Sequence, residues 1–278
     1  MQISLNFAVM RSGLVISTLI FFLAGNSFSQ NVNLVNNAFQ SGEVITYKVK
    51  YNWGVIWLDA GEATFSAVKK EYKGDPAYYF MGVGGTFPKY DWIYKVRDKF
   101  ESYADTLTLK PFRFTRDEKE GPNFTYESAF FNFNKKKAYD VLRINQKARI
   151  DSVKITDATI DVMTAIYWAR CIDFSKYKMN DTIPIVLYLE NKVYHQYIRY
   201  IGKEDLTVEG LGTFHCIKFR PKLIEGTIFK GGEGMTVWAT DDKNKIPVYV
   251  ETPIVVGSIK VYLTKFSGLR NPMSAKVK

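Results

Sequence analysis

The chain has 278 residues, and 38 Lys and Arg against 28 Asp and Glu give it a formal net charge of +10 at pH 7. It contains no His-x-His, His-Glu-x-x-His or Cys-x-x-Cys motif, so we predict no metal site and no cofactor. It also lacks a Gly-x-Ser-x-Gly motif and a glycine-rich phosphate loop, which excludes two common signatures of hydrolases and nucleotide-binding proteins.

The first 29 residues have the pattern of a secretory signal peptide. Arg11 is their one charged residue, an apolar run follows over residues 14–24, and residues 27–29 place small side chains at the spacing of a cleavage site. The run is shorter than the ~20 apolar residues that a membrane span needs. We therefore expect cleavage near Gln30 and an exported chain, residues 30–278, that forms a single mostly β domain without a transmembrane segment.

The mature chain stays basic, which bears on its partners. Without Arg11 it has 37 Lys and Arg against 28 Asp and Glu, or +9. In an exported protein this balance favours acidic envelope partners, such as lipid head groups or an anionic glycan, over nucleic acid. The Lys residues are also dispersed, as they are on solvated strand edges. We expect a periplasmic or outer-membrane-associated protein that binds no nucleic acid, and the sequence leaves its oligomeric state open.

Alternation of apolar and polar residues dominates the chain. Over residues 44–53, Ile45 and Val49 belong to an apolar face and Lys48 to the opposite face. Many short runs of this kind, separated by turn residues, predict a mainly β fold with a strongly curved antiparallel sheet or a barrel-like half-barrel. Further strands are expected at 62–68, 77–83, 126–133, 183–189, 193–201, 214–219, 235–240, 246–250 and 258–266.

The segment 90–97 is the densest local mixture of aromatic and charged residues. We predict that Trp92, Tyr94 and Arg97 belong to a ligand-binding site, because Trp and Tyr beside charged groups suit stacking on sugar rings. The alternative is that Trp92 and Tyr94 cover one end of the sheet as core residues. A second short helix is expected over residues 90–101.

Residues 161–172 depart from the strand pattern and predict one buried helix. Asp161 suits the N-cap position, where a carboxylate accepts the free backbone N–H groups of the first turn. We expect this helix to pack into the concave face of the sheet. Its predicted apolar stripe consists of Val162, Ala165, Ile166, Ala169 and Ile172.

His195, Tyr197 and Arg199 alternate along the strand expected at 193–201 and so share one face. An imidazole, a phenol and a guanidinium in a row could hold a carboxylate, a phosphate or a sugar, and we include them in the predicted ligand-binding site. The alternative is the solvent side of an amphipathic strand. Cys171 and Cys216 fit either a disulfide, which export permits, or two free thiols.

Asp241 and Asp242 separate the strands expected at 235–240 and 246–250. Such a pair could be catalytic, could hold a cation or could form a turn. Neighbouring strand residues point to opposite faces, and Lys243 and Lys245 stand where a calcium loop would need oxygen ligands. We therefore predict a hairpin turn, in which Asp caps its own backbone.

Several short motifs follow one another along the chain: Phe39-x-x-Gly42-Glu43, Gly61, Asp98, Pro111, Asp161 before Tyr167-x-x-Arg170, and Asp241-Asp242-x-x-x-Ile246-Pro247-Val248. Their order resembles the domain-of-unknown-function 3108 family of exported bacterial proteins, over nearly all of the mature chain. The family implies export and leaves the activity unassigned. A remoter similarity to half-barrel lipoprotein carriers of the envelope implies a curved sheet with helices in its mouth.

Binding is the first functional hypothesis. We expect the protein to hold an apolar or amphipathic envelope molecule, a lipid or a glycan, in the concave face of the sheet, and we expect no catalysis. A scaffold that binds another envelope protein through an exposed strand edge is a further alternative.

A carbohydrate-active enzyme is the enzymatic alternative, because glycoside hydrolysis needs only two facing carboxyl groups. Asp98, Glu101, Asp161 and Asp241 could converge on a cleft. Against this, Asp161 already has a structural role as a cap, and Asp98 stands between two basic neighbours that would pair with it.

Overall fold

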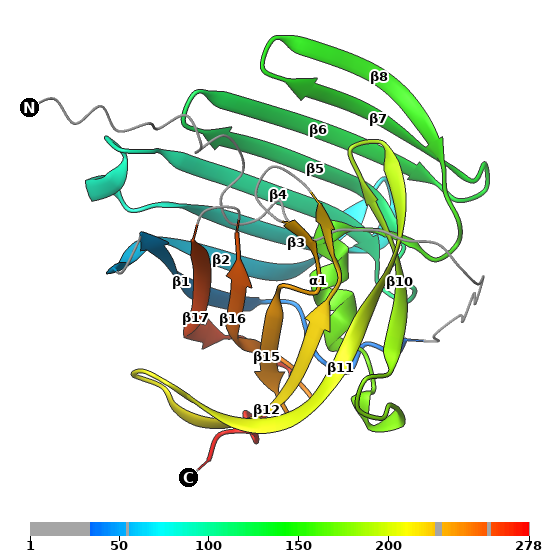
Figure 1. Cartoon of the computed structure of the whole chain (residues 1–278). Helices are drawn as coiled ribbons and strands as arrows, with labels where there is room; N and C mark the ends of the chain where they lie inside the picture. Colours follow the sequence, from blue (N-terminus) through cyan, green and yellow to red (C-terminus); the bar gives the residue numbers. More distant parts are fainter. Residues whose placement is uncertain (1–33, 54–55, 226–229, 255–256, 278) are drawn as a thin grey trace, which may run out of the picture.

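One large antiparallel sheet makes up most of the protein (Figure 1). The structure is a computed structural model and describes residues 34–53, 56–225, 230–254 and 257–277, so the predicted signal peptide lies outside the described residues. Among the described residues, the one α-helix is α1 (Val162–Arg170), and two short 3-10 turns are η2 (Pro88–Tyr90) and η3 (Phe174–Lys176). The strands are β1 (Glu43–Trp53), β2 (Ile56–Tyr72), β3 (Asp75–Thr86), β4 (Val96–Asp105), β5 (Pro111–Glu120), β6 (Asn123–Asn132), β7 (Lys137–Ile144), β8 (Lys147–Lys154), β9 (Thr159–Asp161), β10 (Thr182–Leu189), β11 (Lys192–Val208), β12 (Gly212–Pro221), β13 (Leu223–Glu225), β14 (Lys230–Gly232), β15 (Thr236–Thr240), β16 (Pro247–Pro253) and β17 (Ser258–Ser267).

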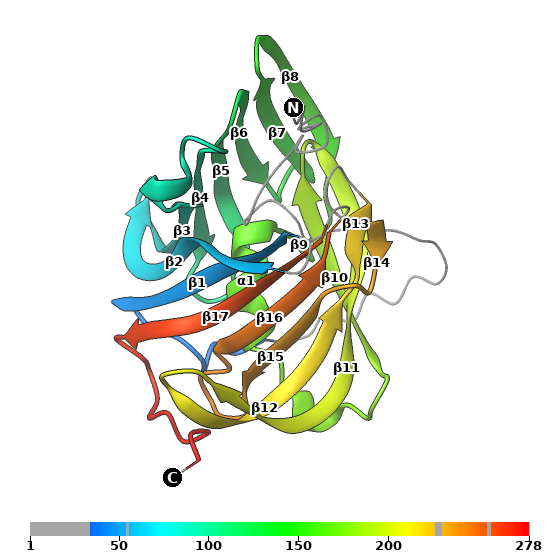
Figure 2. The same cartoon turned by 60° about the vertical axis from the view of Figure 1, so that its left-hand side comes forward.

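The strand order of the sheet is β8-β7-β6-β5-β4-β3-β2-β1-β17-β16-β15-β12-β11-β10-β9. Neighbouring strands are antiparallel except β9 and β10, which run parallel, and β13 and β14 form a separate ribbon. The sheet curls without closing, so β8 and β9 are its edge strands (Figure 2). This mainly β, strongly curved sheet with one buried helix confirms the predicted fold class, and every strand expected from the sequence is present.

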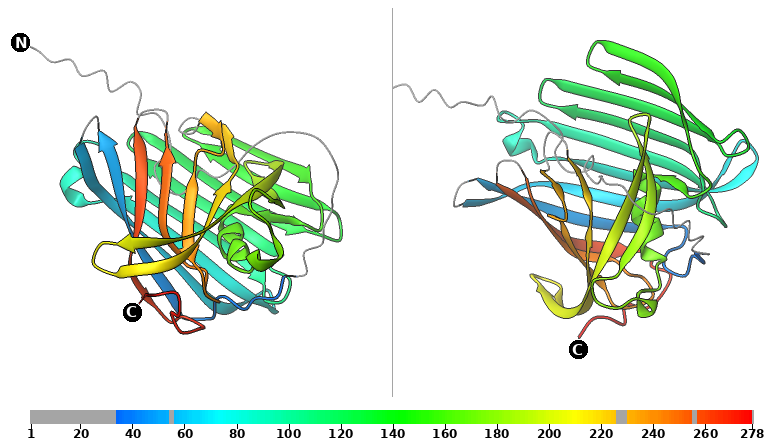
Figure 3. Two further views of the ribbon diagram at one scale, coloured as in Figure 1. Left: turned by 60° about the horizontal axis from the view of Figure 1, so that its bottom comes forward. Right: turned by 45° about the vertical axis from the view of Figure 1, so that its right-hand side comes forward.

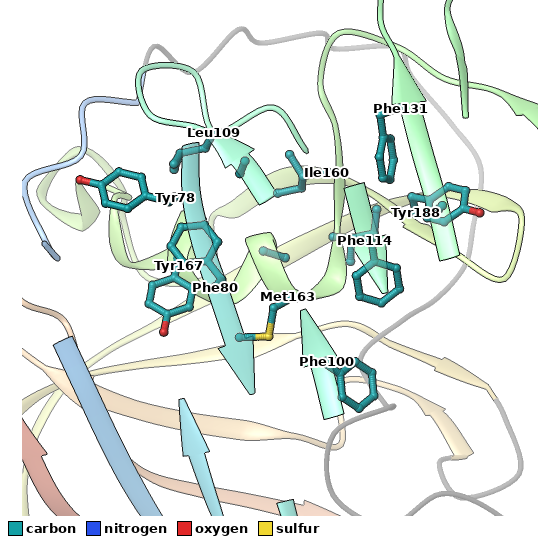
Figure 4. Packing of buried hydrophobic residues seen from close by; sticks show 14 of the residues in the cluster. Tyr78, Phe80, Phe100, Leu109, Phe114, Phe131, Ile160, Met163, Tyr167 and Tyr188 are labelled. Atoms are coloured by element: carbon teal, nitrogen blue, oxygen red, sulfur yellow. The ribbon is translucent and has the colours of Figure 1, made fainter. Parts of the chain in front are cut away.

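Helix α1 lies inside the curve of the sheet and packs against β3, β4, β9 and β10 (Figure 3). Its side chains complete an aromatic core on the concave face (Figure 4). The Phe80 ring stacks on Tyr167 with centroids 4.0 Å apart, and the Phe39 ring meets Tyr167 edge to face at 5.0 Å. Such contacts remove large apolar areas from water, and each Å² of buried apolar surface stabilises the fold by ~25 cal/mol.

The N-terminus of α1 is set by Asp161, as the sequence predicts. The Asp161 Oδ1 atom accepts the backbone N–H groups of Met163 (2.8 Å) and Thr164 (2.9 Å). Its Oδ2 atom accepts the hydroxyls of Ser102 (2.7 Å) and Thr164 (2.8 Å). Because Ser102 belongs to β4, the hydrogen bonds of the fully buried Asp161 join the start of the helix to β4 and also complete the first helical turn.

The buried face of α1 differs from the predicted stripe. Met163, Tyr167 and Arg170 are buried, whereas Val162 and Ile166 are only half-buried. Ala165 and Ile172 of the predicted stripe are buried, and burial extends beyond the stripe to Arg170, because the fold gives this cation a buried partner. The Arg170 guanidinium binds the Glu43 carboxylate through Nη1–Oε1 (2.5 Å) and Nη2–Oε2 (2.8 Å).

The motif residues near both ends of the chain meet at this ion pair. Arg170 Nε also donates to the Asn244 carbonyl (2.9 Å), in the turn between β15 and β16. Its guanidinium lies 5.6 Å from the centres of the Phe39 and Tyr167 rings. Three distant segments are thereby tied to the C-terminal turn of α1, which gives these motifs a structural role.

The second helix expected over residues 90–101 is absent from the described residues. The turn η2 ends at Tyr90, and β4 begins at Val96. Residues 96–105 alternate between buried and less buried positions along the whole strand, with Phe100, Ser102 and Ala104 buried. A period of two is incompatible with a helix, so pairing with β3 and β5 overrides the local composition.

The tip of the β10–β11 hairpin contacts residues of β5, β6 and β8 on the concave side of the sheet. In this tip, Glu190 and Asn191 have φ of 52° and 59°, the left-handed pair that a tight two-residue turn requires. The Glu190 backbone N–H donates to Glu127 of β6 (2.6 Å), and Arg149 of β8 donates to the Glu190 carbonyl (2.8 Å). The hairpin tip therefore covers one end of the concave face.

Candidate functional site

Trp92, Tyr94 and Arg97 lie at the connection between β3 and β4. Trp92 is 83% exposed, which rules out the alternative that it covers the core. The Tyr94 hydroxyl donates to the Glu120 carbonyl (3.1 Å), so this ring holds the turn after β5. Arg97 pairs with Asp91 at 2.6 Å. A role of these three residues in ligand binding stays a prediction.

His195, Tyr197 and Arg199 share one face of β11, as expected from their spacing. His195 is exposed, while Tyr197 and Arg199 are half-buried beside Glu233. The Tyr197 hydroxyl donates to Glu233 Oε1 (2.7 Å), and Arg199 Nη2 lies 2.8 Å from the same atom. The hydrogen bond from Arg199 holds the pKa of Glu233 below its ordinary value. An acidic ligand here would have to displace a carboxylate of the protein itself.

The two predicted sets of ligand-binding residues belong to distant parts of the sheet. Arg97 begins β4 and His195 lies on β11, and seven strands separate these two: β3, β2, β1, β17, β16, β15 and β12. They are two separate surface features, and their joint role in one site stays a prediction.

Asp241 and Asp242 form a turn, as predicted. Asp242 Oδ1 accepts the Thr240 hydroxyl (2.8 Å) and the backbone N–H groups of Asn244 (2.9 Å) and Lys245 (3.2 Å). Asp241 pairs with Lys203 at 2.7 Å. Within the described ranges, no group of three or more His, Cys, Asp or Glu residues is placed to hold a metal ion.

The four carboxylates considered for glycoside hydrolysis do not converge. Glu101 lies on the opposite face of β4 from Asp98 and pairs with Lys99 at 2.8 Å. Asp161 caps α1, and Asp241 belongs to the β15–β16 turn. The expectation that Asp98 pairs with its basic sequence neighbours is wrong, because strand alternation turns it inward.

The inward faces of β4–β7 carry a group of buried acidic residues. In β5 the alternation that buries Phe114 also buries Arg116, Glu118 and Glu120, and Asp98 lies directly opposite Glu118 on β4. We call this group the carboxylate cluster. Its members are the buried Asp98, Glu118, Glu120, Glu127 and Asp140, together with the partly exposed Glu190 from the β10–β11 hairpin tip, and they are arranged around Arg116.

Arg116 organises one half of the carboxylate cluster. Its guanidinium lies 3.3 Å from Glu118, 3.2 Å from Glu127 and 2.8 Å from Glu190. Burial lowers the pKa of Arg116, but the three carboxylates outweigh burial and raise it above its ordinary value. Arg116 therefore stays charged and links β5 and β6 to the tip of the β10–β11 hairpin.

Three of the buried carboxyl groups have pKa values above those of an ordinary Asp or Glu, so they keep their protons to higher pH. Burial raises the pKa of Asp98 to about 9, and the charges of Glu120 and Glu118 add to the effect. Burial likewise raises the pKa of Glu127 to about 8 and that of Asp140 to about 6. At neutral pH, Asp98 is a neutral carboxylic acid that can donate as well as accept a hydrogen bond.

Asp98 and Asp140 are the two members of the cluster with neither carboxylate oxygen in a hydrogen bond of good geometry, and Asp98 has the pKa raised furthest. It is only 4% exposed, and although the backbone amide of Lys119 lies near, neither carboxylate oxygen has a partner in hydrogen-bonding geometry. Gly84 faces it on β3, so no side chain of that residue covers the carboxyl group. A buried polar group without a partner costs ~1–3 kcal/mol, and such groups concentrate at functional sites.

Sequence reasoning missed this cluster. Asp98 was considered but placed in the wrong surroundings, and Arg116, Glu118 and Glu120 were not considered at all. One feature of the sequence could have revealed the cluster: Phe114 shares the alternation of Arg116, Glu118 and Glu120, and this phenylalanine marks the inward face of β5. Cys171 and Cys216 are free thiols, and burial raises their pKa to about 11 and about 12, so they are unreactive.

The fold and the cluster define a curved-sheet protein with a carboxylate-bearing concave face. The chain belongs to the family described as protein of unknown function (DUF3108), whose profile matches residues 46–264. No curated protein matches the sequence. In the described part of the chain, no helix has the length and apolar character needed to cross a bilayer.

One solved structure has a similar fold, and a second gives a weaker match. A beta-barrel-like protein of domain of unknown function DUF1849 from Brucella abortus matches with a TM-score of 0.55 at 10% identity, over 83% of this chain and 99% of that one. A chain from Parabacteroides distasonis ATCC 8503 described as a "putative lipoprotein" matches with a TM-score of 0.33 at 12% identity, over 86% of this chain and all of that one. The first of these likenesses shows the fold alone.

Proposed function

We propose that this chain is an exported envelope protein that binds an amphipathic molecule in the concave face of its sheet, with the polar end of that molecule at Asp98. Export rests on the expected signal peptide over residues 1–29 and on the family resemblance. The observation that carries the proposal is the buried carboxyl group of Asp98, which has the Lys119 backbone amide near it but no partner in good hydrogen-bonding geometry.

The surroundings of Asp98 suit a molecule with two chemical ends. The next inward-facing residue after Asp98 on β4 is Phe100, and the inward-facing residue before Arg116 on β5 is Phe114. Both phenylalanines are fully buried and belong to the same hydrophobic cluster as Met163 of α1 (Figure 4). The concave face thus changes from aromatic to carboxylic within one step of the strand alternation. A neutral carboxylic acid there can bond a hydroxyl, an amide or an amine of the ligand.

Native mass spectrometry of the protein purified from its own envelope tests the proposal. The wild type should carry a bound molecule of defined mass, and Asp98→Leu should lose it while remaining folded. Glu101→Leu is the matched control, because it removes a carboxylate from the outer face of the same strand and should retain the molecule. If Asp98→Leu does not fold, Asp98→Asn replaces it. Wild type without any bound molecule, or equal retention by both variants, would contradict the proposal.

Catalysis on a carbohydrate is the second candidate, favoured by the pairing of Asp98 with Glu118. A carboxyl group with a pKa raised to about 9 opposite a second carboxylate is the arrangement of an acid and its partner in glycoside hydrolysis. Incubation with envelope polysaccharides should then release new reducing ends. Asp98→Asn and Glu118→Gln should each abolish the release, and intact polysaccharide after prolonged incubation with wild type would remove this candidate.

A further inference from the structure

The outer face of β6–β8, the side away from the carboxylate cluster, has an unusual distribution of charge. Residues paired across neighbouring antiparallel strands share a face, so the register assigns every side chain in these three fully described strands. Asp140 and Glu127 point inward and are buried. Asp151 lies opposite Asp140 and therefore shares its face. No carboxylate of β6, β7 or β8 remains for the outer face.

Large apolar side chains are exposed on this outer face. Phe130 lies opposite Tyr139, and Val141 lies opposite Ile150, so the four form one continuous patch across three strands. Their exposed fractions are 38%, 41%, 37% and 83%. Ile150 lies on the edge strand β8, where no further strand covers it. Contiguous apolar exposure of this kind marks a surface that meets another apolar phase.

Cations surround this apolar patch. Lys137, Arg143 and Lys154 belong to the same outer face and are exposed, and Arg113 of β5 lies 5.1 Å from the centre of the Phe130 ring. Lys137 and Lys154 are directly opposite each other. Two like charges in that arrangement repel, and within the described residues neither has an ion-pair partner, so an anion placed between them would stabilise both.

The strand next to β6, β5, carries a carboxylate on this side of the sheet. Asp117 lies opposite Tyr126 of β6, at the border of the patch, and is paired with Lys119 at 3.5 Å. Asp157, in the connection after β8, pairs with Lys110 and Lys136. In the described part of the chain, no ion pair involves Lys137, Arg143 or Lys154. The combination of exposed aromatic and aliphatic side chains with unneutralised cations is the chemistry that recognises an anionic lipid surface.

We propose that the outer face of β6–β8 docks on the head groups of an anionic lipid bilayer. Tyr139, Val141 and Ile150 enter the boundary between head groups and acyl chains, and Lys137, Arg143 and Lys154 bind lipid phosphates. An acidic polysaccharide shares the charge but would leave the aliphatic Val141 and Ile150 in water, which is why a lipid surface fits better. Docking by this face is independent of ligand binding at Asp98, which lies on the other side of the sheet.

Co-sedimentation of the mature protein with vesicles tests this docking. Vesicles of phosphatidylglycerol and phosphatidylethanolamine should bind the wild type, and vesicles of phosphatidylcholine alone should bind it at least about 10-fold less. Adding salt should weaken binding, because salt screens the lysine–phosphate attraction. Equal binding to both kinds of vesicle, or none to either, would overturn the proposal.

Two variants separate the charged and apolar contributions. The triple change Lys137→Glu, Arg143→Glu and Lys154→Glu should lower vesicle binding about 100-fold or more, and Val141→Ser with Ile150→Ser should lower it about 10-fold. Circular dichroism should show both variants folded, since these residues are exposed. If the charge variant fails to fold, the apolar variant still decides. Wild-type binding by the apolar variant would overturn the proposal.

A matched control removes the same net charge elsewhere. Lys178, Lys192 and Lys243 are exposed and lie outside β6–β8, so their replacement by Glu should leave vesicle binding within about 3-fold of wild type. An equal loss in the control would reduce the effect to net charge and contradict docking by this face. Binding to alginate that exceeds binding to the vesicles and survives in the apolar variant would assign the face to a polysaccharide instead.

Discussion

The Arg170 guanidinium and the Glu43 carboxylate form a buried two-pronged ion pair that joins the end of α1 to the start of β1. Their side chains are 4% and 0% exposed. In a low-dielectric interior, removing one partner leaves the other charge uncompensated, which is more costly than the absence of both. The pair therefore fixes where α1 lies in the curve of the sheet.

Breaking this pair should destabilise the protein strongly. Arg170→Met leaves the Glu43 carboxylate buried alone and should lower the free energy of unfolding by ~3–5 kcal/mol. The matched change Arg199→Met removes a half-exposed partner of Glu233 and should cost no more than ~1 kcal/mol. Urea denaturation of both variants measures the difference. Equal costs would show that the buried pair is not what holds α1.

Asp161 should matter more than an ordinary helix cap. A cap at a helix end typically contributes ~1 kcal/mol, but Asp161→Ala would also leave the buried hydroxyls of Ser102 and Thr164 without their acceptor. We expect a loss of ~2–4 kcal/mol, measured by thermal or urea denaturation. Asp161→Asn keeps one acceptor oxygen and should cost clearly less. A loss of ~0.5 kcal/mol or less in Asp161→Ala would contradict the structural role of the cap.

Asp241 and Asp242 should behave as turn residues. Changing both to Asn should keep the fold, because Asn Oδ1 can still accept from Thr240 and from the backbone of the turn. The melting temperature should fall by a few degrees at most, and neither protein should respond to calcium or to a chelator. A calcium-dependent rise in the wild type that the variant lacks would make this pair a cation site.

The features predicted correctly from the sequence are those that depend on residues close together in the chain. Asp161 is read correctly because a cap depends on neighbours within three residues, and Val49 is buried and Lys48 paired on the other face because alternation is local too. Strand β5 was not predicted, because the charged residues Arg116 and Glu118 occupy inward positions where the alternating pattern of a strand normally has apolar residues.

The carboxylate cluster depends on contacts that a single strand cannot reveal. Whether Glu127 faces solvent or the core is decided by the β10–β11 hairpin, whose tip is more than sixty residues further along the chain and covers it through Glu190. Likewise, Asp98 has basic neighbours in sequence but acidic neighbours in space, because β5 supplies Glu118 across from it. The sheet register, not the local sequence, sets the electrostatics of this site.

Asp98 should make stability fall as pH rises. Its pKa in the folded protein is raised to about 9, whereas in the unfolded chain an Asp carboxyl group titrates near ~4. Between these values the folded state binds the extra proton, so the free energy of unfolding decreases as pH increases through this window. Asp98→Asn removes this titration. The variant should therefore gain on the order of 3–5 kcal/mol relative to wild type between pH 5 and pH 9.

Urea denaturation of wild type and Asp98→Asn at pH 5, 7 and 9 measures this gain. Glu127 and Asp140 have raised pKa values too and weaken the wild type in the same direction, but both remain in the variant, so the difference between the two proteins isolates Asp98. Glu101→Gln is the control, because hydrogen bonding by Lys99 and Tyr79 holds the pKa of Glu101 below its ordinary value despite partial burial. The Glu101→Gln change should leave the dependence of the free energy of unfolding on pH unchanged between pH 5 and pH 9. Parallel stability curves for wild type and Asp98→Asn would mean that Asp98 is ionised and satisfied in the folded protein, and the proposed ligand contact would lose its physical basis.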